Sequence, residues 1–378
     1  MANKGGVNIL NDEKEQNISD PFDIFSVPVI ERDHVKSQIV HIQPSQPITD
    51  DGPIIFEYSS HGGMYVDGDF TELQGELEII NTDTNAKTTA DDDIAVINMF
   101  PITQFNKIEV KLNDVIVSDS SSTNHAFKSY FDAKFSYNKS VKSEIMKSTE
   151  YYFEEKKTFI EAKALSEDSS GVFKEKHEIF VKAEDPVRFR TQLYLDVFNT
   201  HKYIPSDVSF VITFHRNTTD FALMGVNAKS GKYKIKIKKL ALVIKKISPS
   251  TTVGLQHNAA YNKKFTAMIP FTQTVLTHRL MHRGAVQQNF SNVTLGNILP
   301  RQLYVFFVEH QSFSGHMEKN PFVFKPHNLK SIRFNVNGTM YPTTQYNLDF
   351  NKNDVMSAYM DFLHSIGTSN ILVFSFLF

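Results

Sequence analysis

The sequence predicts an all-β fold of two tandem jelly-roll sandwiches, with short helices in the loops. The first observation is that short runs rich in β-branched and aromatic residues recur along the chain, bounded by Pro, Gly or Asp. The second is that the 378 residues include 32 Phe and 14 Tyr, which favour half-buried strands. The third is a Gly-, Asn- and Ser-containing stretch at 217–232, which divides the runs into two comparable series. Composition alone leaves one large sandwich open as an alternative.

The first series of strands is expected within residues 34–228, after a flexible polar arm at 1–33. A turn signal, Asp-Asp-Gly-Pro, comes directly before the run IIFEYS. Leu73, Leu77 and Ile79 alternate with polar residues, which is the pattern of a strand with one buried face. The strands predicted in this half are 37–44, 54–59, 73–80, a hairpin at 107–119, 177–183, 187–198 and 208–215.

Helices and a long insertion interrupt the strands. In 124–137, apolar side chains recur every three or four residues, which predicts a helix, and Asn124 is a candidate N-cap. The charged residues 138–176 have no clear period, and we expect a long loop with one or two short helices there. A further short helix is predicted for 355–366. The second half, 229–378, is expected to contain strands at 232–249, 265–278, 301–310, 330–338 and 371–378.

The composition excludes several classes of function. With no cysteine, the chain can form neither disulfides nor thiolate zinc sites nor a cysteine nucleophile. The formal charge of −2, from 40 basic and 42 acidic residues, gives no global attraction to DNA or membranes. With no signal peptide and no run of 18 apolar residues, we expect neither secretion nor membrane insertion. The Asn-x-Ser/Thr motifs are then expected to be chance matches; they begin at Asn17, Asn138, Asn217, Asn289, Asn292 and Asn337.

No motif has the pattern of a catalytic or metal site, so we predict no catalytic, cofactor-binding or metal-binding residues and no enzyme activity. His278 and His282 are spaced like the zinc ligands of a metalloprotease helix, but Arg279 stands where that motif needs a glutamate. The three aspartates at 91–93 cluster as calcium ligands do, yet they lack the EF-hand spacing. We interpret both groups as surface loop residues. No phosphate-loop or nucleophile-elbow pattern occurs.

One predicted strand carries lysines on a single face. Lys234, Lys236 and Lys238 alternate with apolar residues, so three ammonium groups line one side of the run. One interpretation is a basic strip that contacts packaged DNA through its phosphates. The other, which the near-neutral charge of the chain favours, is a solvated sheet face with a lysine-guarded edge.

Several runs in a fixed order resemble the major capsid proteins of Polinton (Maverick) elements and adintoviruses, which belong to the double jelly-roll lineage of viral hexons. The resemblance extends from about residue 20 to about residue 367, and no single run in it is diagnostic. The runs that carry it are PFDIFSVP (21–28), TDDGPI (49–54), KIEVKLND (107–114), YKIKIKKLALVIKKISPS (233–250), NILPRQLYVFFVEHQSFSG (297–315), KNPFVF (319–324) and 349–363.

The resemblance implies two eight-stranded jelly rolls side by side, and a homotrimer whose six rolls form a pseudo-hexagonal capsomer. In the virion, such capsomers join neighbouring capsomers and a single-jelly-roll penton protein in an icosahedral shell around double-stranded DNA, assembled inside the host cell. The resemblance implies no cofactor and at most weak, non-specific DNA contact. The arm and the insertion at 138–176 are expected to contribute contacts between capsomers. Because relatives continue past the strand that follows 355–366, we expect the second roll to lack its last strands and to expose an apolar edge.

Other classes of function are left open by the sequence. A jelly roll can also serve as a carbohydrate- or partner-binding module, with exposed aromatic residues and Asp or Asn near its loop tips. A cupin-like metal enzyme would need clustered His and carboxylate ligands, whereas the 14 histidines here are scattered. A minor vertex protein would have one roll, and this chain is too long for that. A folded monomer would favour the binding module, and a stable trimer would favour the capsomer.

Overall fold

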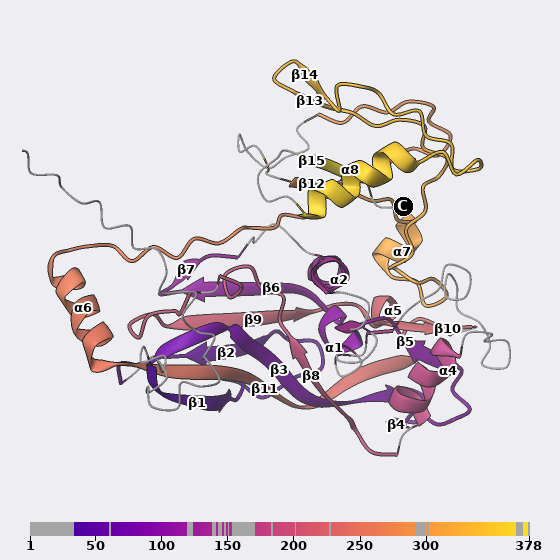
Figure 1. Ribbon diagram of the computed structural model, residues 1–378. Coiled ribbons are helices and arrows are strands. Elements are labelled where there is room, and N and C mark those ends of the chain that lie inside the picture. The colour runs from indigo at the N-terminus through magenta and orange to yellow at the C-terminus, as the bar shows by residue number, and fades with distance from the viewer. Residues whose placement is uncertain are drawn as a thin grey trace, which may run out of the picture.

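The structure, a computed structural model, is mostly β, with curled sheets and a few short helices (Figure 1). The all-β prediction is therefore confirmed. The expected arm at 1–33 and most of the insertion at 138–176 lie outside the described residues. The structure describes residues 34–376 except for 60–61, 119–123, 138–140, 143–145, 147–148, 150, 153–170, 183, 201, 227, 292–299, 301 and 368–372.

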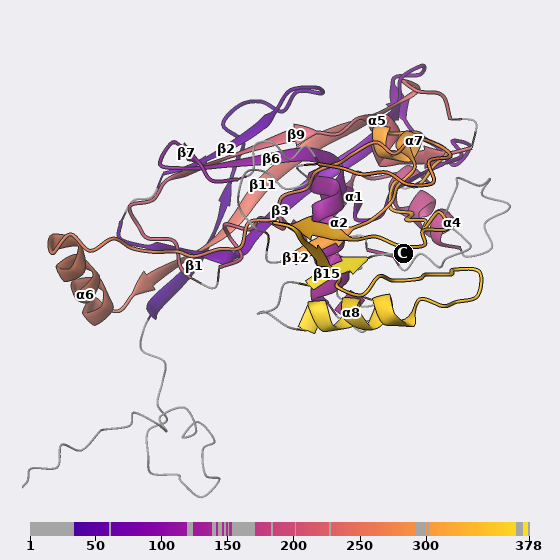
Figure 2. The ribbon, with the colours of Figure 1, turned by 90° about the horizontal axis from the view of Figure 1, so that it is seen from above.

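Two curled sheets pack face to face as a sandwich (Figures 1 and 2). Their inner faces hold the main apolar core, to which Phe56, Leu73 and Phe214 contribute side chains with no exposed surface. The first sheet is formed by β1 (His34–Ile42), β11 (Tyr233–Pro249) and β3 (Tyr65–Asn81), with β4 (Ala86–Lys87) and β8 (Val187–Gln192) also paired to β3. The second is formed by β2 (Ile54–Tyr58), β9 (Phe210–Arg216), β6 (Phe105–Leu112) and β7 (Val115–Ile116), in that order.

The order of these strands is that of a jelly roll. Leaving aside the short strands β4, β5 (Ile94–Val96) and β10 (Leu223–Gly225), eight strands are nested as four antiparallel pairs. β1 pairs with β11, β2 with β9, β3 with β8 and β6 with β7, so the first of the eight strands pairs with the last and each later pair is nested inside. The β1–β11 and β3–β8 pairs form the first sheet, and the β2–β9 and β6–β7 pairs form the second. An eight-stranded double sheet wrapped in this way is a jelly roll.

Strand β11 changes the expected division of the chain. The sequence assigns this run to the second half, whereas the structure places it between β1 and β3, at the centre of the first sheet. The boundary at 228 therefore falls before the last strand of the first roll. The register shifts between Ile237 and Lys239, which marks a β-bulge. Because of this extra residue, both Ile237 and Leu240 are buried although they are three positions apart.

The helix predictions are confirmed more fully than the strand predictions. α2 (His125–Ser136) and α8 (Met356–Gly367) lie where they were predicted, but the Asn124 side chain makes no capping hydrogen bond. The strand predicted at 177–183 is wrong. Residues 177–182 lie instead at the end of α4 (Val172–His177) and in a π-helical turn, η3 (Glu178–Lys182). A short apolar run such as Ile179-Phe180-Val181 fits a buried helix as well as a strand, and here Phe180 is fully buried.

The chain after Pro249 forms smaller elements around α8. It contains α6 (Thr251–Asn262) and α7 (His310–Ser314), together with two separate two-stranded ladders among the described residues. In one ladder β12 (Gln302–Val305) runs parallel to β15 (Val373–Phe376). The other is the hairpin of β13 (Phe334–Val336) and β14 (Thr339–Tyr341), closed by Asn337 and Gly338, both with positive φ. Asn-Gly is the preferred pair for such a turn because both positions need positive φ.

Helix α2 joins this C-terminal part to the jelly roll and lies between them (Figure 1). Tyr130 stacks on Phe322, with 4.4 Å between the ring centroids. Phe127 is fully buried, and four rings of the C-terminal part surround it at centroid distances of 5.5 to 6.5 Å. These four are Phe306, Phe313, Phe322 and Phe324. The phenylalanine-rich composition therefore supplies the joint between the two parts as well as the core of the sandwich. Two further helices, α1 (Phe100–Thr103) and α5 (Thr219–Ala222), are single turns.

Candidate assembly surface

The residues considered as metal ligands have structural surroundings. His278 and His282 lie in an extended segment, not on a helix, and the His278 ring lies 5.0 Å from the Phe313 ring. Asp92 accepts hydrogen bonds from the Asn81 amide at 3.2 Å and the Tyr233 hydroxyl at 3.0 Å, so it ties its loop to β3 and β11. Within the described ranges, no three His, Asp or Glu side chains gather as a metal site. None of the helices described there is long and apolar enough to cross a bilayer.

Four lysines of β11 form ion pairs with neighbouring carboxylates while remaining partly exposed. Because β11 is central in its sheet, these lysines do not guard an edge. The basic strip is largely neutralised by its neighbours, and such surface pairs contribute about 0–1 kcal/mol each. This arrangement favours a solvated, salt-bridged face over a DNA-binding strip. The pairs are Lys238 with Glu78 (2.6 Å), Lys239 with Glu76 (3.1 Å), Lys245 with Asp67 (3.3 Å) and Lys234 with Asp50.

An exposed segment, residues 251–291, leaves the jelly roll after β11 and crosses to the C-terminal part (Figures 1 and 2). We call it the crossing segment. It contains α6, and none of its residues is buried. Ten of the eighteen large apolar side chains exposed in the described structure lie in it, so an apolar surface is concentrated on this one segment. They are Leu255, Tyr261, Phe265, Met268, Phe271, Val275, Leu280, Met281, Val286 and Phe290.

Polar contacts at two places help to hold the crossing segment against the jelly roll. The Tyr65 hydroxyl and His257 Nδ1 lie 2.7 Å apart, which fixes α6 to the start of β3. The backbone N–H of Thr274 donates to Asp196 Oδ2 at 2.6 Å. The Asp196 carboxylate also lies 2.9 Å from the ammonium of Lys128 on α2. The segment is therefore positioned by polar contacts and by Leu276, which packs against the main core, while ten of its large apolar side chains stay exposed.

Next to the contact between Thr274 and Asp196, α2 carries a buried polar cluster formed by His125, Lys128 and Asp132. Lys128 Nζ donates to the backbone oxygen of Tyr194 at 2.7 Å and lies 2.6 Å from Asp132 Oδ2. Burial and the nearby Lys128 ammonium lower the pKa of His125 to about 3, so this histidine is neutral near pH 7. The single ammonium of Lys128 thus compensates two carboxylates, one of which holds the crossing segment.

The charge of the crossing segment has one sign. It contains four basic residues and no acidic residue, and no Asp or Glu occurs between Asp220 and Glu309. Residues 51–100, in contrast, contain eleven acidic residues and one lysine. A cationic, apolar segment on a chain with an acidic region is electrostatically complementary to another copy of that chain. Sequence analysis missed this feature, although the long interval without acids was a visible signal.

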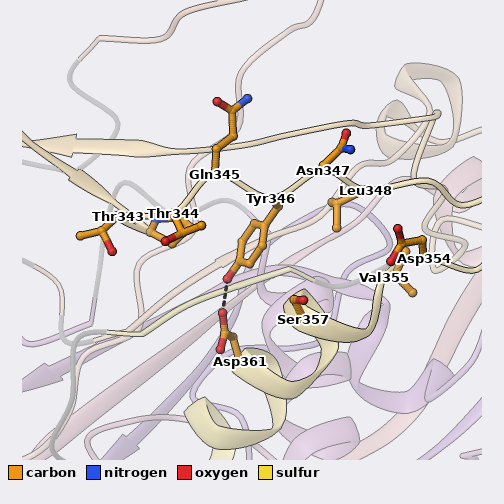
Figure 3. A pocket seen from close by; sticks show the side chains of 11 residues that line it. Thr343, Thr344, Gln345, Tyr346, Asn347, Leu348, Asp354, Val355, Ser357 and Asp361 are labelled. Carbon is orange, nitrogen blue, oxygen red and sulfur yellow. Dashed lines mark hydrogen bonds between the residues drawn. The ribbon is translucent and has the colours of Figure 1, made fainter.

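A separate polar pocket of about 360 Å³ lies between residues 342–348 and α8 (Figure 3). The Tyr346 hydroxyl points at Asp361 and donates to its Oδ2 at 2.5 Å. Burial and this bond raise the pKa of Tyr346 above its ordinary value, so the hydroxyl keeps its proton. The eleven lining residues bring hydroxyl, amide and carboxylate groups but no Lys, Arg or His. The pocket therefore suits a neutral, hydroxyl-rich ligand better than an anion.

Comparisons with known proteins find distant likeness. No protein-family model matches the chain. An uncharacterised protein of Caenorhabditis elegans is 20% identical over 292 residues, which cover 73% of this chain and 66% of that protein. A chain of the Sputnik virophage is 10% identical, with a TM-score of 0.41 over 62% of this chain and 52% of that one. The mavirus major capsid protein is 12% identical, with a TM-score of 0.35 over 67% of this chain and 55% of that one. This chain spans about two-thirds or less of the length of each of these proteins.

Proposed function

We propose that this protein is a viral major capsid protein. Its homotrimers form pseudo-hexagonal capsomers in an icosahedral shell around double-stranded DNA. The observation that supports this most strongly is an eight-stranded jelly roll that carries an anchored segment with ten exposed apolar side chains. The roll already buries its own core, and these side chains remain exposed beside it. A symmetric assembly of copies would cover them.

The proposal extends to the organisation of the particle. The first roll runs from residue 34 to Pro249, which ends β11. The region after it, which forms two two-stranded ladders among the described residues, is proposed to correspond to the second roll. The partners are two further copies in the trimer, neighbouring capsomers and a single-jelly-roll penton protein. The protein acts in the virion, has no enzyme activity, and contacts DNA at most weakly. Two strands of the first roll, β11 and most of β6, lie in runs that resemble Polinton-type capsid proteins.

Substitutions on the crossing segment are expected to abolish the trimer without unfolding the chain. The variant replaces Met268, Leu280 and Val286 by serine; these side chains are 83%, 65% and 103% exposed. Because each is exposed, its loss changes stability by no more than about 0.5 kcal/mol. A matched control replaces exposed apolar residues elsewhere, namely Tyr203, Met340 and Met356.

Sedimentation velocity at equal protein concentrations measures the result. The wild type and the control variant are expected to sediment as trimers, and the crossing-segment variant as a folded monomer. A crossing-segment variant that stays trimeric would show that this segment is not the assembly surface. A monomeric wild type would refute the capsomer proposal itself.

The polar pocket favours a second candidate function, carbohydrate binding. Its hydroxyl, amide and carboxylate groups match the hydrogen-bonding needs of a sugar, and it holds one buried aromatic residue, Tyr346. The same sedimentation experiment separates the two functions, since a binding module needs no trimer. A folded wild-type monomer would favour this second candidate.

A further inference from the structure

Residues 265–278 have the sequence of a strand but pair with no strand in the described structure. The run FTAMIPFTQTVLTH is rich in aromatic and apolar residues and carries no acidic or basic side chain other than the terminal histidine. From 266 to 273, no backbone–backbone hydrogen bond is formed with other described residues. An extended, exposed chain with unpaired N–H and C=O groups is a ready partner for the edge of a sheet.

An open sheet edge is available on every copy. Within the described residues β1 pairs with β11 on one side only, and this leaves nine residues of edge free on the other side. Ile39, on this strand, is 51% exposed. The edges of the second sheet are less suitable, because β7 has two residues and Ile55 of β2 already accepts a backbone hydrogen bond from Ser45.

We propose that residues 265–277 of one copy add as an edge strand to β1 of a second copy within the capsomer. This deepens the capsid function proposed above and rests on it. Each chain then carries one donor segment and an acceptor edge on β1. Such a head-to-tail contact forms a ring when the rotation between copies closes, and the proposed trimer requires that closure. The basic residues flanking the donor, among them Lys264 and Arg279, would face exposed acids near the acceptor edge, among them Asp51 and Glu57.

Pro270 determines which side of the donor strand forms the hydrogen bonds. Along a strand, successive residues direct their N–H and C=O groups to opposite sides. Pro270 has no N–H, so its side must face away from β1. The pairing residues are then Ala267, Ile269, Phe271 and Gln273. The proline also blocks addition of a further strand, which limits assembly to one donor for each edge.

Two proline substitutions test this geometry. Ile269→Pro removes an N–H from the pairing side and is expected to weaken association at least tenfold. Thr272→Pro lies on the same side as Pro270 and is expected to change association by less than twofold. Neither residue forms a backbone–backbone hydrogen bond with the residues that the structure describes, so both variants are expected to unfold at the same denaturant concentration as wild-type monomer.

Sedimentation of the full-length variants is combined with hydrogen exchange of the peptide that covers 265–278. The peptide should be protected in the wild-type and Thr272→Pro oligomers and exchange freely in Ile269→Pro. If the wild type is oligomeric and the two proline variants associate equally, whether strongly or weakly, strand addition is overturned. The capsomer proposal would still stand in that case. A monomeric wild type would instead remove the capsid function on which this inference rests.

Discussion

Replacing Phe127 by alanine is expected to lower the free energy of unfolding by about 3–5 kcal/mol. Phe127 is fully buried on α2, and its ring contacts Phe221 of the jelly-roll part as well as four rings of the C-terminal part. Removing the ring takes contacts from both parts at once and leaves a cavity that rigid neighbouring rings cannot fill. The C-terminal part should consequently separate from the roll more readily.

Denaturant unfolding of the wild type and two comparison variants measures this effect. Phe127→Leu keeps most of the apolar volume and is expected to cost less than about 1.5 kcal/mol. Tyr203→Ala removes an aromatic ring that is 49% exposed and is expected to cost at most about 0.5 kcal/mol. Equal losses for Phe127→Ala and Tyr203→Ala would show that α2 is not the joint between the two parts.

Replacing Lys128 by methionine is expected to lower the free energy of unfolding by about 3 kcal/mol, the lower end of the range for breaking a buried ion pair. The Lys128 side chain is 12% exposed and lies between Asp132 and Asp196. Methionine keeps the length of the side chain but leaves both carboxylates without a counter-charge. The lower end of the range applies because Asp132 and Asp196 remain 35% and 20% exposed.

The pH dependence of the Lys128 variant distinguishes lost charge from lost packing. Burial opposes the ammonium, but Asp132 and Asp196 outweigh it, so the pKa of Lys128 is raised above 10.5. The stabilisation is therefore complete below the unfolded-state pKa and is lost only as the pH rises through the folded-state value. Burial raises the pKa of Asp132 in the folded protein, so protonation of this carboxyl at acid pH should shrink the difference between variant and wild type. A difference that is constant from pH 3 to pH 8 would point to packing alone. Adding Asp132→Asn should restore part of the stability if charge is the cause.

The sequence predicts those elements whose pattern is local. β3, β9 and the β6–β7 hairpin alternate cleanly along their own length, and α2 and α8 repeat at helical spacing over three turns. The central position of β11 was not predictable, because it depends on β1 and β3, which lie far away in the sequence. The strand predicted at 265–278 is wrong for a related reason: strand residues form a strand only where a partner edge is present.

The candidate assembly surface was only partly visible in the sequence. The interval without acidic residues around the crossing segment can be read directly from the chain, as can Pro270 within its strand-like run. The contact from Thr274 to Asp196 joins residues 78 positions apart, and no spacing rule indicates it. Likewise, the carboxylates that neutralise the β11 lysines are known as partners only once β3 is placed beside that strand.

The mass and outline of the purified full-length protein test the central claim most directly. Light scattering is expected to give three times the chain mass of 43.2 kDa. Negative-stain images of the same sample are expected to show particles with a hexagonal outline, because the proposed trimer would place six jelly rolls around its axis. A folded monomer of a single chain mass, at concentrations where capsomers would form, would contradict the account and favour the carbohydrate-binding function.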